Sequence, residues 1–217
     1  MNESAITHTL YLIRHGVADG VAGRCIGHTD VPLSTEGRAQ CAALAGVWYP
    51  PADATIWSSD LSRARDSARE LCAVWGRADD AVQTDAALRE CAFGEWDGQT
   101  WTEIEARDAV RLDRWMRDWV TESPPGGESL PMLVERVRGA LRGITSTAAS
   151  TTHVIVSHAG VLRAMLSLVL GAPDTAAFNW AMPHAHVTAI RLNRVEVDGV
   201  VGGRVDWLHA FPSPDPT

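Results

Sequence analysis

Residues 9–16, TLYLIRHG, join a short apolar run to a polar tripeptide. An apolar run of this length between polar residues predicts a strand that is buried on both faces, as in a parallel sheet. Residues 153–160, HVIVSHAG, repeat the pattern, so His15 and His158 each directly follow a predicted strand. Because the carboxyl ends of parallel strands meet at one edge of a sheet, we expect both imidazoles to lie in one ligand crevice.

The rest of the chain alternates predicted strands and helices. Ser34, Thr100 and Ser129 stand where helix N-caps are expected, and Gly76 and Gly171 where helices should end. Helices are predicted over 35–48, 61–75, 101–119, 130–144 and 160–170, with further strands over 55–58, 186–192 and 204–208. This order predicts a three-layer α/β/α fold with a central, mostly parallel sheet covered by helices on both faces. We expect one domain over residues 1–217, with its core at about 9–192 and then a C-terminal strand and a Pro-rich tail from Pro212.

The composition argues against several classes of protein. The chain carries 19 basic and 27 acidic side chains, a net charge of −8, whereas nucleic acid and anionic membranes bind clustered Lys and Arg. The four cysteines form no Cys-x-x-Cys pair and have no His at metal-ligand spacing, so neither a zinc site nor a disulfide framework is predicted. No apolar stretch has the length of a membrane span, and residues 1–9 lack a signal-peptide pattern, so we expect a soluble cytoplasmic protein.

Arg14 stands beside His15, and this pairing favours an anion over a metal ion. A guanidinium repels a divalent metal, whereas its planar fork matches two oxygens of a phosphoryl group. The backbone N–H groups that begin the helix after His158 would add donors at its positive end. Arg63 or Arg65, early in another predicted helix, would supply a second guanidinium, unless both lie on a solvated helix face.

A phosphoester bond breaks more easily when an acid protonates the leaving oxygen. Glu90 is a candidate, because it lies among apolar and aromatic residues in the segment 88–96, LRECAFGEW. The residues alone do not separate it from Glu95 and Asp97. Trp96 and Trp101 follow in the chain, where they would either pack in the core or offer a stacking surface to a ring of the substrate.

Four motifs in this order resemble the histidine phosphatase superfamily, also called phosphoglycerate-mutase-like. They are LIRHG over 12–16, SSDLSRA over 58–64, LRE-x-x-FG-x-W-x-G over 88–98 and VSHAG over 156–160. The resemblance covers about residues 10–192. It implies that His15 is the nucleophile, that Arg14, Arg63 and His158 surround the phosphoryl oxygens with His158 also part of the catalytic set, and that Glu90 is the general acid. It implies no metal and no cofactor.

The chain also departs from the family pattern. Many members follow Arg-His-Gly with Glu and place an Asn a few residues later to contact phosphate, whereas here Val17 comes next and residues 18–23 contain no Asn. We expect the N–H groups near Gly27 or the hydroxyl of Thr29 to replace that contact, with His28 in the same substrate loop. Residues 23–33, GRCIGHTDVPL, and 124–129, PPGGES, most resemble the branch that contains α-ribazole phosphatase.

The expected activity is that of a metal-independent phosphomonoesterase that acts through a phosphohistidine on a small phosphorylated metabolite, with α-ribazole 5'-phosphate as one candidate. A cofactor-dependent phosphoglycerate-type mutase and a non-catalytic phosphoester-binding module are the alternatives. Mutases usually carry a longer insertion before the second histidine, which closes the site against water, so the shorter span here favours hydrolysis. We expect a small-molecule partner, no nucleic acid and no membrane, and leave a homodimer open.

Overall fold

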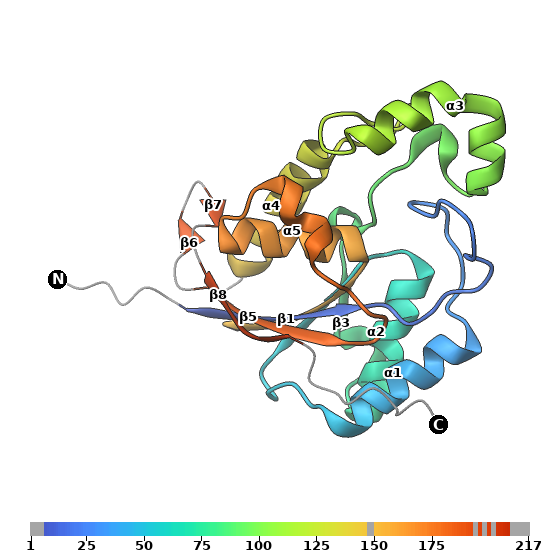
Figure 1. The fold of residues 1–217 in the computed structure, drawn as a ribbon. Helices are drawn as coiled ribbons and strands as arrows, with labels where there is room; N and C mark the ends of the chain where they lie inside the picture. Colours follow the sequence, from blue (N-terminus) through green and yellow to red (C-terminus); the bar gives the residue numbers. More distant parts are fainter. Residues whose placement is uncertain (1–6, 147–149, 193–194, 197–198, 201–202, 209–217) are drawn as a thin grey trace.

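A computed structural model describes residues 7–146, 150–192, 195–196, 199–200 and 203–208, and within them a six-stranded sheet forms the centre (Figure 1). The strand order is β3-β2-β4-β1-β5-β8. The strands β3, β2, β4 and β1 run parallel to one another, β5 is antiparallel to β1, and β8 is antiparallel to β5. Their bounds are β1 His8–Arg14, β2 Thr55–Ser58, β3 Val82–Thr84, β4 Thr152–Ser157, β5 Val187–Leu192 and β8 Gly203–Leu208.

Helices cover both faces of this sheet, as the sequence predicts. Figure 1 shows α1 and α2 on one face and α4 and α5 on the other. Alternation along β1 explains the two cores, because successive side chains point to opposite faces. Leu10 and Leu12 pack with α4 and α5, whereas Ile13 packs with α1 and α2. The bounds are α1 Thr35–Val47, α2 Ser62–Val74, α4 Leu130–Ser146 and α5 Ala159–Leu170.

The predicted caps are present at three helix ends. Ser34 Oγ accepts the N–H of Gly37 at the start of α1. Thr100 and Glu103 form a complete capping box at the start of α3, Trp101–Arg117. Gly171 ends α5 with a left-handed φ of 60°, a conformation that costs glycine little. These local signals fix the helix boundaries close to where the sequence places them.

The helix α3 projects beyond the strand ends, and a small separate core joins it to the segments around Cys25 and Trp96. Cys25, Trp96, Ile104 and Leu112 are buried together there. Trp96 is therefore a core residue, and its Nε1 donates to the carboxylate of Asp108, where α3 has a non-helical turn. Figure 1 shows α3 on the same side of the molecule as the loop that follows β1. This small core thus holds α3 above the carboxyl ends of the strands.

The sequence does not predict the short elements, because segments of two to six residues carry no readable periodicity. They are β3, the two-stranded pair β6 Val195–Glu196 and β7 Gly199–Val200, and the 3-10 helices η1 Asp79–Ala81, η2 Ala86–Leu88, η3 Gly94–Trp96 and η4 Asp174–Asn179. The Pro-rich tail from Pro212 lies outside the described residues. Over the part of the chain that is described, no helix combines the length and apolar character needed to cross a bilayer.

Candidate active site

The carboxyl ends of β1 and β4 bring the two predicted histidines together. The strands are parallel neighbours with Arg14 opposite Ser157, so the following residues, His15 and His158, leave the sheet side by side. Their ring centroids are 4.9 Å apart, and the planes meet at 61°. The two residues are 7% and 0% exposed. One crevice therefore holds both imidazoles.

His15 is held in a single tautomer. Its Nδ1 lies 2.7 Å from the carbonyl oxygen of Gly16. Since a carbonyl only accepts, Nδ1 carries the proton and Nε2 keeps its lone pair. Burial lowers the pKa of His15 well below its ordinary value despite the hydrogen bond to Gly16, and the nearby cations Arg63 and Arg14 lower it further. A neutral imidazole with a free Nε2 lone pair can act as a nucleophile.

Neither ring nitrogen of His158 has a hydrogen-bond partner among the described residues, and the same is true of Nε of Arg14. Burial, followed by the charges of neighbouring His15 and Arg63, holds the pKa of His158 well below its ordinary value. A buried polar atom without a partner costs about 1–3 kcal/mol. The single N–H of the neutral His158 ring and the Nε–H of Arg14 therefore suit an acceptor that is not part of the chain.

The segment before β5 wraps around the end of β1. Nη1 of Arg14 donates to the carbonyl of Met182 at 2.7 Å, and the N–H of Ala185 donates to the carbonyl of Arg14 at 2.9 Å. Nδ1 of His184 donates to the carbonyl of His15 at 2.8 Å. Burial, and then the charge of Arg14, lower the pKa of His184 to about 4. This third imidazole of the site stands beside His15, with ring centroids 5.2 Å apart.

Arg63 is the second guanidinium at the site, and Arg65 is not. Arg63 is 2% exposed, and its guanidinium donates to the carbonyls of Gly27 at 2.7 Å and Thr29 at 2.9 Å. Positions two apart on a helix lie on nearly opposite sides. The Arg65 side chain, 35% exposed, accordingly does not line the cavity that Arg63 lines.

The loop at Gly27, His28 and Thr29 is bonded to the carboxylate of Asp97. The N–H groups of all three residues and the Thr29 hydroxyl donate to the carboxylate of Asp97, over 2.6–3.1 Å. Burial acts to raise the pKa of Asp97, but these hydrogen bonds lower it by more. The donors of Gly27 and Thr29 are therefore bonded within the protein in this structure, and a contact of this loop with phosphate in place of the missing Asn stays a prediction. The loop instead supports Arg63 through its carbonyls.

Glu90 is the candidate acid that lines the same cavity as the two histidines. One carboxylate oxygen accepts the N–H of Cys91 at 2.9 Å, and both accept the N–H of Gly160, at 3.1 and 3.2 Å. A Cβ on Gly160 would stand 2.3 Å from Oε1 of Glu90, so the carboxylate can hold this position only beside a glycine. Glu95 is exposed and Asp97 is committed to the loop. The structure thus separates Glu90 from the two alternatives.

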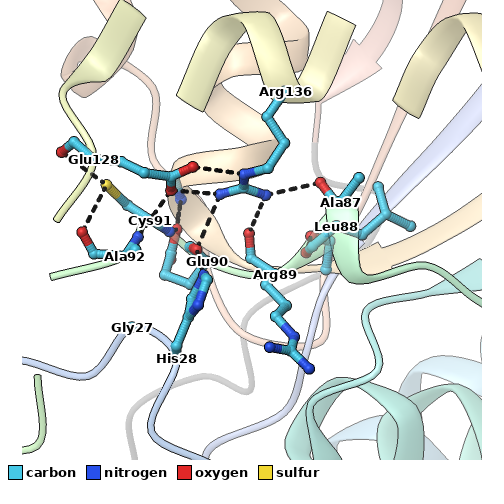
Figure 2. Close-up of polar contacts among 12 residues, drawn as sticks. Gly27, His28, Ala87, Leu88, Arg89, Glu90, Cys91, Ala92, Glu128 and Arg136 are labelled. Atoms are coloured by element: carbon cyan, nitrogen blue, oxygen red, sulfur yellow. Dashed lines mark hydrogen bonds and ion pairs between the residues drawn. The ribbon is translucent and has the colours of Figure 1, made fainter. Parts of the chain in front are cut away.

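The backbone that carries Glu90 is fixed by Arg136 and Glu128, shown in Figure 2. Nε and Nη2 of Arg136 donate to the Glu128 carboxylate at 2.8 and 2.7 Å, and this carboxylate also accepts the N–H of Ala92. Burial acts to raise the pKa of Glu128, but the bonds from Arg136 and Ala92 lower it by more. The remaining contacts of the guanidinium, at 2.8–3.2 Å, are with the carbonyls of Ala87, Arg89 and Glu90. His28 Nε2 donates to the Glu90 carbonyl as well.

One cavity of about 210 Å³ is lined by both histidines, by Arg14 and Arg63, and by Glu90. It contains every predicted catalytic and phosphate-binding residue but none of Gly27, His28 and Thr29. Arg24 and His184 line it too. The sequence leaves the role of His184 open and predicts none for Arg24, because both enter from loops that no strand pattern locates. The complete lining is Arg14, His15, Ala18, Val21, Arg24, Ile26, Arg63, Glu90, His158 and His184. Guanidinium groups around neutral imidazoles, with one carboxyl at the edge, suit a phosphoryl group and a proton donor.

Comparisons with known proteins agree with this arrangement. Residues 10–200 match the model of the family described as "Histidine phosphatase superfamily (branch 1)". The adenosylcobalamin/alpha-ribazole phosphatase of Escherichia coli K12 is 27% identical over 186 residues, covering 85% of this chain and 90% of the relative. The glucosyl-3-phosphoglycerate phosphatase of Mycolicibacterium vanbaalenii is 34% identical over 172 residues, covering 76% of this chain and 75% of the relative.

The crystal structure of a putative alpha-ribazole-5'-P phosphatase from Escherichia coli K-12 superposes with a TM-score of 0.82. At 24% identity it covers 94% of this chain and 96% of its own, and it supports the fold. The matched span contains all of β1 except its first two residues, the whole of β4 and every residue that lines the cavity described above. The chain therefore belongs to branch 1 of the histidine phosphatase superfamily, and it is a phosphoric monoester hydrolase.

Proposed function

We propose that the protein hydrolyses small phosphate monoesters in two displacements, through a phosphohistidine at Nε2 of His15. Arg14, Arg63 and His158 bind the phosphoryl oxygens, and Glu90 transfers the protons. The observation that carries this proposal is the fixed tautomer of His15 beside the unpaired, fully buried ring of His158.

In the first displacement, Nε2 of His15 forms a bond to phosphorus while the ester P–O bond breaks. The leaving oxygen takes a proton from Glu90 in its acid form, so a neutral alcohol departs. The guanidinium groups stabilise the charge that spreads over the equatorial oxygens of the transferred group. Both arginines are already oriented by backbone carbonyls, so little reorganisation is needed.

In the second displacement, water attacks phosphorus and the P–N bond breaks. The Glu90 carboxylate accepts a proton from that water, and inorganic phosphate leaves with neutral His15 restored. The contacts of Glu90 with the N–H groups of Cys91 and Gly160 keep the carboxyl at the cavity edge through both steps. No metal ion is needed in this sequence of steps, because the positive charge comes from the side chains.

The substrate we propose is a small phosphorylated metabolite, and α-ribazole 5'-phosphate is the first compound to test. The overall likeness to the Escherichia coli relative over most of both chains supports that choice. A panel of nucleotides, sugar phosphates, phosphoamino acids and α-ribazole 5'-phosphate ranks the candidates by kcat/KM.

Rapid-quench mass spectrometry tests the mechanism directly. We expect a phosphoryl group on His15 in mid-turnover, activity that survives EDTA, and inhibition by vanadate. An unmodified His15, together with full activity of His15→Ala, would refute the proposal.

Glu90→Gln tests the proton transfer. We expect it to slow hydrolysis of alkyl phosphates more than that of p-nitrophenyl phosphate, whose leaving group hardly needs a proton. Equal losses on both esters would remove Glu90 from this role.

A further inference from the structure

A second cavity, of about 250 Å³, adjoins the cavity around His15 and His158, and Glu90 lines both. We call it the aromatic pocket, because five of its lining residues are Phe93, Trp101, Trp115, Trp119 and Phe178. The mechanism proposed above uses none of them.

The aromatic rings are held by one another. Phe93 makes edge contacts with Trp101 and Trp115, at centroid distances of 6.5 and 6.1 Å, and the two Trp rings lie nearly parallel at 16°. On the other side, Trp119 meets Phe178 edge-on at 4.3 Å. Yet Trp101 is 37% exposed and Phe178 is 58% exposed. Large aromatic groups kept in place at the surface are typical of a binding site for an apolar ligand.

The charged groups on the pocket wall are engaged elsewhere. Glu128 is paired with Arg136, and Glu90 accepts backbone N–H groups. Nε of Arg163 donates to the carbonyl of Trp180, and its guanidinium stacks on the Phe178 ring at 4.9 Å. The wall therefore favours an apolar ring over a second anionic group.

We propose that the preferred substrates are phosphate esters of an alcohol that carries a flat, apolar ring system, and that this ring enters the aromatic pocket. The inference rests on the proposed function. If Glu90 protonates the leaving oxygen, the rest of the alcohol must extend past Glu90, and the aromatic pocket begins there. A cavity of about 150 Å³ holds benzene, so 250 Å³ has room for two fused rings.

Ethyl phosphate and its naphthyl-substituted analogue have the same kind of primary leaving oxygen, so their comparison isolates the effect of the ring, and 3-phosphoglycerate serves as an anionic ester without a ring. We compare kcat/KM for 2-(2-naphthyl)ethyl phosphate, ethyl phosphate and 3-phosphoglycerate. Stacking of a ring on aromatic side chains changes binding about 10–100-fold. The naphthyl ester should exceed ethyl phosphate by that factor, and 3-phosphoglycerate should not approach it.

Trp101→Ala and, separately, Phe178→Ala should each reduce the naphthyl-to-ethyl ratio about tenfold, through KM more than kcat. Both side chains are partly exposed, so neither variant opens a hole in the main core. Tyr49→Ala is the matched control, because Tyr49 is an aromatic residue 59% exposed and outside the pocket. Tyr49→Ala should leave kcat/KM unchanged for both the naphthyl ester and ethyl phosphate.

A naphthyl-to-ethyl ratio near one, a preference for 3-phosphoglycerate, or a ratio unchanged in both pocket variants would overturn the inference while leaving phosphatase activity intact. If no ester is hydrolysed, the proposed function fails instead. Binding of 2-(2-naphthyl)ethanol, monitored by tryptophan fluorescence, then tests the aromatic pocket independently of catalysis. Saturable binding that Trp101→Ala weakens supports the inference, and its absence overturns it.

Discussion

Replacing Arg136 by Met should destabilise the protein far more than the same change at Arg138, two residues further along α4. Arg136 and its partner Glu128 have side chains that are only 20% and 15% exposed. The guanidinium contacts the Glu128 carboxylate and the carbonyls of Ala87, Arg89 and Glu90. Removing it leaves a half-buried carboxylate with the Ala92 N–H alone.

Breaking a buried ion pair on one side costs about 3–5 kcal/mol. Because Glu128 keeps its hydrogen bond from Ala92, the expected cost of Arg136→Met lies near the lower end of this range, at about 3 kcal/mol. In a chain of this size that loss lowers Tm by about 6–12 °C. Arg138 pairs with Glu135, whose side chain is 70% exposed, so Arg138→Met should cost at most about 0.5 kcal/mol.

Urea unfolding followed by circular dichroism measures both variants. The double variant Arg136→Met/Glu128→Leu should recover part of the loss, because the uncompensated charge is removed as well. A cost for Arg136→Met no larger than that for Arg138→Met would refute this reasoning. The reasoning would also be refuted if the double variant were less stable than Arg136→Met by a further ion-pair cost.

Arg63→Ala should lower kcat about 10²–10³-fold, because it removes one preorganised charge from the phosphoryl group. Arg65→Ala should stay near wild type in the same steady-state assay, because Arg65 does not line the cavity. Gly160→Ala should slow alkyl ester hydrolysis, since the new Cβ would displace the Glu90 carboxylate, whereas Gly139→Ala, with open space around it in α4, should stabilise the helix by about 1 kcal/mol. Retained activity in Gly160→Ala would contradict the contact. Burial lowers the pKa of His153 to about 4, so the unfolded chain binds more protons between that value and about 6.5. Stability should therefore fall as the pH falls through this window, and His153→Gln should flatten the profile in pH-dependent urea melts.

The main features of the fold follow from local signals. The apolar run before His15 and its counterpart before His158 predict two buried parallel strands, and the register of β1 with β4 confirms that their ends adjoin. Ser34 and Thr100 cap helices as predicted, because a capping hydrogen bond involves only three or four consecutive residues. β3 was missed, since it spans three residues, two of them exposed.

Parts of the site depend on contacts between distant loops, and the sequence could not locate these. His184 lies 169 positions from the His15 carbonyl that it contacts. Asp97 was considered as an acid, but it bonds to a loop 68–70 positions earlier. Arg136 stands on an ordinary amphipathic helix, and its contacts with the Glu90 segment appear only in the folded chain. The choice of Arg63 over Arg65 came from the family resemblance, and burial of Arg63 explains it physically.

The way Arg14 and Arg63 are anchored has an electrostatic consequence. Both are oriented by peptide oxygens, from Met182 in one case and from Gly27 and Thr29 in the other. A carboxylate would aim a guanidinium equally well, but it would also cancel the field that an incoming dianion feels. Peptide dipoles supply direction while leaving the full unit charge uncancelled by a bonded counterion. An acidic protein with a net charge of −8 can in this way maintain a positive electrostatic potential that attracts phosphate at one site.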